Sequence, residues 1–155
     1  MKNKQDLTTK NFEKIGWHDC KIYGLAFDDL SFNLYLDIDY ISEWIEPSKE
    51  DEGYKFRVAP ATLNFHNVWN ISFDIETNLS LEIDNITRNN PHSPKNKEIY
   101  PNAIEYDWLI ELQQGEISFK SIGFDLHLRE QPIKMQMQTL SLKERGGISF
   151  STFLI

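Results

Sequence analysis

Apolar and polar residues alternate with period two along most of the chain. This spacing places successive side chains on opposite faces of a β-strand, so each alternating segment predicts a strand with one buried face. The segments are 32–40, 61–66, 69–76, 79–84, 104–112, 117–119, 122–129 and 133–137. In the first of them, Asn33, Asp37 and Asp39 fall on the polar face, and we expect their side chains to meet solvent.

Local signals predict how these strands connect. The three consecutive segments between residues 61 and 84 predict a meander. Gln113-Gln114-Gly115 predicts the turn of a hairpin, because glycine adopts the positive φ that many short loops need. Helical spacing is nearly absent, and only residues 9–15 predict one or two helical turns, with Thr8 or Thr9 as the N-cap.

We therefore predict an all-β fold, an antiparallel sandwich or open barrel with meander and hairpin connections and at most one or two short helices. The length fits a single domain over residues 1–155. Residues 1–14 are expected to form a flexible N-terminal segment. Residues 42–53 predict an acidic loop, and residues 87–102 predict a longer polar loop. Long loops are often functional, and a tolerated surface insertion explains them equally well.

The charge balance narrows the classes of partner. Lys and Arg total 16 against 24 Asp and Glu, so the formal charge is −8. An acidic surface repels polyanions, which disfavours binding to nucleic acid. The hydrophobic content of 40% excludes intrinsic disorder.

The apolar runs and the single cysteine of the chain bear on where the protein resides. The chain shows no apolar run typical of a signal peptide near its N-terminus, and no apolar window of about 20 residues that would cross a bilayer. A single cysteine, Cys20, cannot form an internal disulfide, which fits a reducing compartment. We therefore expect a cytoplasmic protein that does not associate with membranes.

The densest group of chemistry-bearing residues is Trp17-His18-Asp19-Cys20. A zinc site needs further ligands at motif spacing, and the chain contains no CxxC, HxxxH or HExxH. It also lacks a nucleophile elbow, a P-loop and a dinucleotide fingerprint. We therefore expect no bound metal, no cofactor and no catalytic residue, and we favour a binding protein over an enzyme.

A second set of polar residues supports an alternative. Asp37 and Asp39, and likewise Asp125 and His127, share a strand face at i and i+2 spacing. Such pairs do acid–base chemistry when burial or a neighbouring charge shifts a pKa. The alternative function is a small hydrolase or ligand-binding barrel with a polar cluster in its mouth. That cluster comprises His18, Asp19, Asp37, Asp39, Asp125 and His127.

Acidic residues are better organised than any catalytic set. The candidate partner-binding residues are Glu43, Trp44, Glu46, Glu50, Asp51 and Glu52. A second acidic run holds Glu105, Asp107, Glu111 and Glu116. If the two runs adjoin, they form a negative surface for a basic protein partner, with Trp44 as an aromatic anchor. A solvated acidic face, with Trp44 in the core, explains the same pattern.

Four motifs stand out: WHDCKIYG at 17–24, LDIDYI at 36–41 followed by Trp44, FRVAPATL at 56–63 and GEISF at 115–119. Together they resemble a family of small uncharacterised bacterial proteins, over about residues 16–132. The resemblance carries no catalytic residues onto this chain. More loosely, a small acidic single domain is similar to the immunity proteins that neutralise bacterial toxins, so the expected partner is a basic toxin. Residues 145–150, RGGISF, are either a further motif or a frayed tail.

Overall fold

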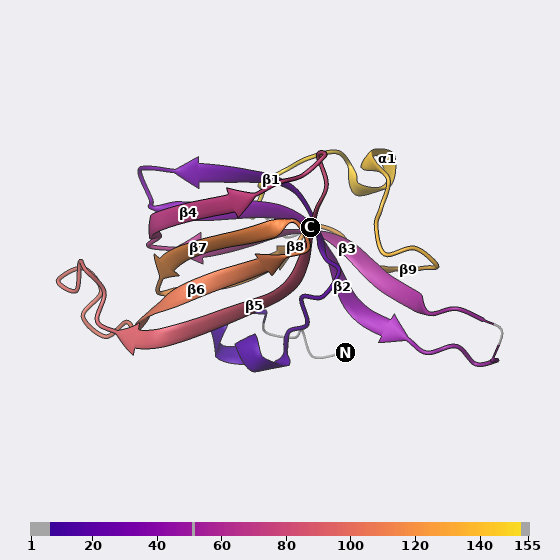
Figure 1. Cartoon of the computed structure of the whole chain (residues 1–155), viewed down its shortest axis with the longest axis horizontal. Helices are drawn as coiled ribbons and strands as arrows, with labels where there is room; N and C mark the ends of the chain where they lie inside the picture. The colour runs from indigo at the N-terminus through magenta and orange to yellow at the C-terminus, as the bar shows by residue number, and fades with distance from the viewer. Residues whose placement is uncertain (1–6, 51, 153–155) are drawn as a thin grey trace.

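The structure is a computed structural model, and it describes residues 7–50 and 52–152 (Figure 1). Within these ranges the chain forms one open antiparallel sheet of nine strands. The strands are β1 (Lys21–Asp28), β2 (Asn33–Ile45), β3 (Lys55–His66), β4 (Trp69–Ile75), β5 (Leu81–His92), β6 (Glu105–Leu112), β7 (Gly115–Ser121), β8 (Gly123–Leu128) and β9 (Ile133–Met135). The helices in the same ranges are a 3₁₀-helix at Thr9–Lys14 and the short α1 (Leu142–Arg145). The predicted all-β class with at most two short helices is confirmed.

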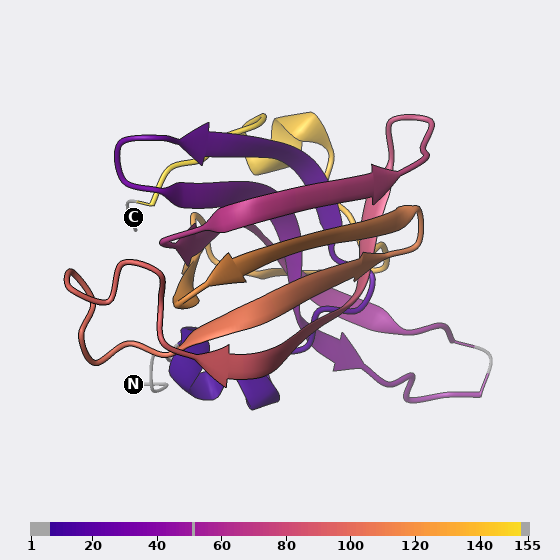
Figure 2. The same ribbon diagram turned by 60° about the vertical axis from the view of Figure 1, so that its left-hand side comes forward.

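Two series of hairpins, β1–β2–β3 and β5–β6–β7, build the two halves of the sheet. The order across it is β4-β7-β6-β5-β1-β2-β3-β8, and β9 pairs with β3. The halves join where Lys21 and Ile22 of β1 pair with Glu82 and Leu81 of β5. Figure 2 shows β4, β7, β6 and β5 side by side in one layer. The predicted β6–β7 hairpin is confirmed, because Leu112 pairs with Gly115 across the turn.

The predicted meander over residues 61–84 is wrong, although each of its strands exists. β3 runs into β4 through Asn67 and Val68, yet β4 pairs with β7 and not with β3. Likewise β7 runs into β8 through Ile122, and β8 pairs back onto β3. Alternation predicts strands but not their partners, because every strand with one buried face has the same period.

Aromatic rings from the two halves of the sheet meet in the core. Phe65 of β3 lies 4.7 Å from Phe119 of β7, measured between ring centroids. Trp108 of β6 lies 5.8 Å from Phe124 of β8. Phe12 of the 3₁₀-helix contacts Trp108 edge-on at 5.2 Å. The helix therefore covers an end of the core.

The predicted turns at residues 9–15 are confirmed, since the Thr8 hydroxyl caps the 3₁₀-helix by accepting from the Lys10 amide. The expectation of a flexible segment is wrong for residues 7–14. Phe12 is buried there, and the Leu7 carbonyl accepts a hydrogen bond from the Leu126 amide at 2.8 Å. Residues 1–6 lie outside the described residues.

The C-terminal segment, residues 140–152, covers the outer face of β1, β2 and β3. The Thr62 hydroxyl of β3 donates to the Ser151 carbonyl at 2.7 Å. The ring of Phe150 packs over β1, so close that a Cβ at Gly24 would lie 3.2 Å from it. The middle of β2 is therefore buried on both faces. The expectation that Asp37 and Asp39 meet solvent is wrong, because both are fully buried under this segment.

Both predicted loops are shorter than expected. Residues 87–92 continue β5 and pair with β6, for example Thr87 with Leu109, so the loop occupies residues 93–104. Pro91 and the positive φ of Asn90, +54°, interrupt the alternation without ending the strand. The β2–β3 hairpin likewise extends to Ile45 and Lys55 and leaves residues 46–54 as its loop.

Among the described residues, no helix combines the length and the apolar character needed to span a membrane.

Candidate functional site

The β2–β3 hairpin extends beyond the body of the molecule (Figure 1). Exposed aromatic residues gather where its strands meet the 46–54 loop. Trp44 is 42% exposed and Tyr54 is 48% exposed. The imidazole of His18 stacks on Trp44, with 5.9 Å between centroids and 24° between planes. Phe56, which is buried, contacts Trp44 edge-on at 5.0 Å. A buried ring therefore holds an exposed tryptophan in place, which excludes Trp44 as a core residue.

Carboxylates surround this cluster. Glu43 accepts a hydrogen bond from Arg57 at 2.8 Å across the hairpin. His18 lies 3.6 Å from Asp19 and 3.9 Å from Asp84. Exposed acids follow along the hairpin loop: Glu46, Glu50 and Glu52. Asp51, the remaining candidate, lies outside the described residues. We call His18, Trp44, Tyr54 and these described acids the hairpin surface.

Asp37 and Asp39 lie elsewhere, in a buried ion-pair network. The guanidinium of Arg145 donates to both carboxylates, at 2.6 Å to Asp37 and 3.0 Å to Asp39. Arg129 donates to Asp37 at 2.7 Å, and the Ser149 amide donates to it at 3.0 Å. Each carboxylate is thus matched by a guanidinium. The network is buried and holds the C-terminal segment on the sheet.

Tyr23 completes this network from β1. Its hydroxyl donates to Asp39 at 2.8 Å, and its ring lies 3.8 Å from the guanidinium carbon of Arg145. Burial, followed by the hydrogen bond to Asp39, raises the pKa of Tyr23, so the phenol stays a donor. In the sequence, this network was signalled by the RGGISF motif at residues 145–150. The side chain of Arg145 is fully buried, so this segment is not a frayed tail.

Asp125 and His127 occupy a third place, on the outer face of β8. Asp125 pairs with His66 of β3, with 2.7 Å between Oδ2 and Nε2. Burial lowers the pKa of His127. The six residues of the alternative polar cluster therefore fall into three separate groups in the structure. They do not line one common pocket. No group of three or more His, Cys, Asp or Glu in the described ranges could hold a metal ion.

Cys20 is fully buried, and its amide donates to the Trp17 carbonyl at 3.2 Å. Burial raises the pKa of its thiol to about 12. A thiol of this kind stays protonated at neutral pH, so Cys20 is a core residue and not a nucleophile.

Two members of the second acidic run, Glu105 and Asp107, do not add free negative charge to the molecular surface. Glu105 is fully buried, and Asp107 is paired with Lys120. Glu111 and Glu116 face each other across β6 and β7. Charge counting along the sequence could not reveal that the first two carboxylates are neutralised locally.

A cavity of about 320 Å³, wide open to solvent, lies beside the buried Glu105, and sequence reasoning missed it. Its walls come from β4, β5, β6, β7 and the 93–104 loop, and they include Trp69, His92, Lys95 and Lys120. These residues are far apart along the chain and form no motif. Only the pairing of the strands brings them together.

No family model matches the chain, and neither a curated protein nor a solved structure does. The resemblance to a bacterial family and the likeness to immunity proteins stay predictions.

Proposed function

We propose that this chain is a cytoplasmic protein-binding domain that takes a basic protein partner on the hairpin surface. Neutralisation of a basic toxin, as immunity proteins do, is the concrete version of this function. The observation that carries the proposal is Trp44, an exposed tryptophan held by Phe56 and His18 and surrounded by carboxylates. Binding hot spots are typically aromatic residues, and complementary charge speeds the encounter with the partner.

The charge test uses two variants of equal net charge. One exchanges Glu43, Glu46, Glu50 and Glu52 for Lys. The control exchanges four exposed acids outside the hairpin surface for Lys: Asp29, Asp74, Glu76 and Glu130. Each set moves the formal charge from −8 to 0. We expect the hairpin variant to lose most of the association rate and its dependence on salt, and the control to keep most of both.

The anchor test replaces Trp44 with Ala. We expect a loss of about 2 kcal/mol or more of binding free energy, since truncating a central aromatic anchor typically costs this much. Phe27→Ala is the control, because Phe27 is 60% exposed and lies outside the hairpin surface. The partner is captured from the host with wild-type protein as bait and identified by mass spectrometry. Its association rate and affinity for each variant are then measured by surface plasmon resonance. A partner that binds the hairpin variant and Trp44→Ala as tightly as wild type contradicts the proposal.

A further inference from the structure

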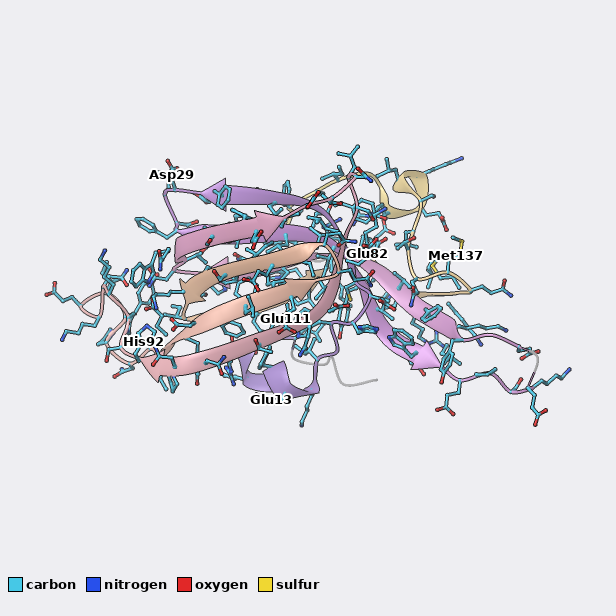
Figure 3. All side chains as sticks on the ribbon, viewed as in Figure 1. Glu13, Asp29, Glu82, His92, Glu111 and Met137 are labelled. Carbon is cyan, nitrogen blue, oxygen red and sulfur yellow. The ribbon has the colours of Figure 1, made fainter. Side chains whose placement is uncertain are left out.

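The cavity beneath the 93–104 loop lies at the opposite end of the molecule from the β2–β3 hairpin. Figure 3 labels His92 at that end, beside the loop. The cavity is therefore a second, separate feature, and its chemistry differs from that of the acidic hairpin surface. Its walls carry the side chains of Lys95, Lys120 and His92.

Glu105 forms the floor of the cavity and is neutralised within it. Its carboxylate accepts from Trp69 Nε1 at 2.5 Å and lies 2.6 Å from His92 Nε2. The other ring nitrogen of His92, Nδ1, lies 2.5 Å from the Asn90 carbonyl. A carbonyl and an ionised carboxylate only accept, so this geometry favours the protonated ring, in which both nitrogens of His92 donate. The hydrogen bond to Asn90 and then the one to Glu105 raise the pKa of His92 accordingly.

Two lysines add further positive charge over the same tryptophan. The ammonium of Lys95 lies 5.0 Å from the centroid of Trp69, and that of Lys120 lies 5.5 Å from it. Lys120 is paired with Asp107. Lys95 has no carboxylate partner among the described residues. In a chain of charge −8, the cavity thus gathers two ammonium groups and a histidine of raised pKa, beside the carboxylate of Glu105 in its lining and that of Asp107, which pairs with Lys120.

The loop that carries Lys95 is held firmly. Asn67 and Asn96 exchange two amide hydrogen bonds, each 2.8 Å long. Asn67 lies in the bend between β3 and β4 and is buried, and Pro94 of the loop is also buried. Lys95 lies between these two fixed points, two residues after the exposed Ser93. These contacts fix the backbone on either side of Lys95, whose ammonium lies over the Trp69 ring.

We propose that this cavity binds the phosphate group of a small molecule, with Lys95, Lys120 and Ser93 as the donors. Lysine binds phosphate as a point charge, and the described residues that line the cavity supply lysine ammonium groups rather than the guanidinium fork that binds carboxylate or phosphate in a bidentate manner. Ligand pockets of proteins begin at about 300 Å³, so the cavity has room for more than inorganic phosphate alone. A phosphate monoester of a small organic alcohol is the class of ligand that fits.

The test follows the Trp69 indole N–H by NMR during titration at constant ionic strength. The ligands are inorganic phosphate, glycerol phosphate and malonate, and a Trp69→Phe variant assigns the signal. We expect saturable shifts with both phosphates and none with malonate. Tighter binding of glycerol phosphate identifies a monoester as the ligand, and equal binding identifies free phosphate.

Variants separate the cavity from general surface charge. Lys95→Gln removes an ammonium that has no ion pair and should weaken phosphate binding on the order of tenfold. Lys97→Gln is the matched control on the same loop, outside the cavity lining, and should leave the affinity unchanged. Lys120→Gln should weaken binding as well. Shifts that never saturate, malonate binding equal to phosphate, or equal losses in Lys95→Gln and Lys97→Gln overturn the proposal.

Discussion

The surroundings of His92 and of His127 shift their pKa values in opposite directions. His92 donates to a backbone carbonyl and a carboxylate, and these hydrogen bonds raise its pKa. Burial lowers the pKa of His127, and the neighbouring charges of Asp125 and His66 act against each other there. The two residues therefore make opposite contributions to stability as pH changes.

The sign of each contribution follows from comparing the pKa in the folded protein with that of histidine in the unfolded chain, about 6.5. The stabilisation from His92 is fully present below that value and is lost as pH rises through the higher folded pKa. The stabilisation associated with neutral His127 is present above about 6.5 and is lost as pH falls through the lower folded pKa.

We expect these opposite contributions to appear in the free energy of unfolding, measured in urea between about pH 5 and pH 8. The difference in unfolding free energy between wild type and His92→Gln should shrink as pH rises. The difference between wild type and His127→Gln should grow over the same range. Slopes of the same sign for the two variants contradict this assignment, and NMR titration of each ring provides an independent check.

At the scale of single elements, the β6–β7 turn shows where glycine is required. Gly115 has φ +142°, and a Cβ on it would lie 1.9 Å from the Asp74 carbonyl oxygen of β4. The turn therefore packs against a neighbouring strand with no space for a side chain. The sequence predicted the turn but not this close approach, because the approach depends on β4 pairing with β7.

Gly115→Ala should lower the unfolding free energy by more than about 1 kcal/mol, because alanine fits neither the backbone conformation nor the space. Gly16→Ala is the control, since nothing lies within 4 Å of a Cβ there. Chemical denaturation measures both. Equal stability of the two variants would mean that β4 does not press against the turn.

The C-terminal segment explains why sequence reasoning placed Asp37 and Asp39 in solvent. Period-two alternation distinguishes the two faces of a strand, and it reports nothing about a second layer on the polar face. Here that layer brings Arg145 onto both carboxylates. The position of β2 could be predicted from its pattern, while its burial depends on a segment about 100 residues later.

Arg145→Met should be strongly destabilising, by about 3–5 kcal/mol, because it leaves the buried Asp39 without its guanidinium and Asp37 with Arg129 alone. Arg57→Met is the matched control: Arg57 pairs with Glu43 at the surface, and its loss should cost less than about 1 kcal/mol. Urea unfolding compares the two. If Arg145→Met does not fold, Arg145→Lys keeps the charge but loses the fork and should be destabilised relative to wild type. A stability of Arg145→Lys equal to wild type would show that the network does not hold the segment.

At the scale of the whole molecule, most strands were predictable, whereas their pairing, apart from the β6–β7 hairpin, was not. Each alternating segment became a strand, but β1 was missed, because Tyr23 on one face and Ile22 on the other are both covered. The cavity lining comes from five different segments, so only the complete topology assembles it. The hairpin surface lies within one hairpin plus His18, Asp19 and Asp84, and its acids on the hairpin and Trp44 could therefore be predicted from the sequence.

The two sites lie at opposite ends of the long axis of the molecule (Figures 1 and 3). The hairpin surface is acidic, while the cavity gathers cations. A protein seated on the hairpin would leave the cavity open.

The spacing of the ion-pair partners along the chain also has a consequence for biosynthesis. Asp37 leaves the ribosome 92 residues ahead of Arg129 and 108 residues ahead of Arg145. Until those arginines emerge, β2 carries carboxylates that have nothing to neutralise them, so the outer face of the nascent sheet stays hydrated. Translation thus makes the closing of this layer a late event, and a ribosome that stalls before Arg145 leaves a product whose outer layer is incomplete and open to proteases.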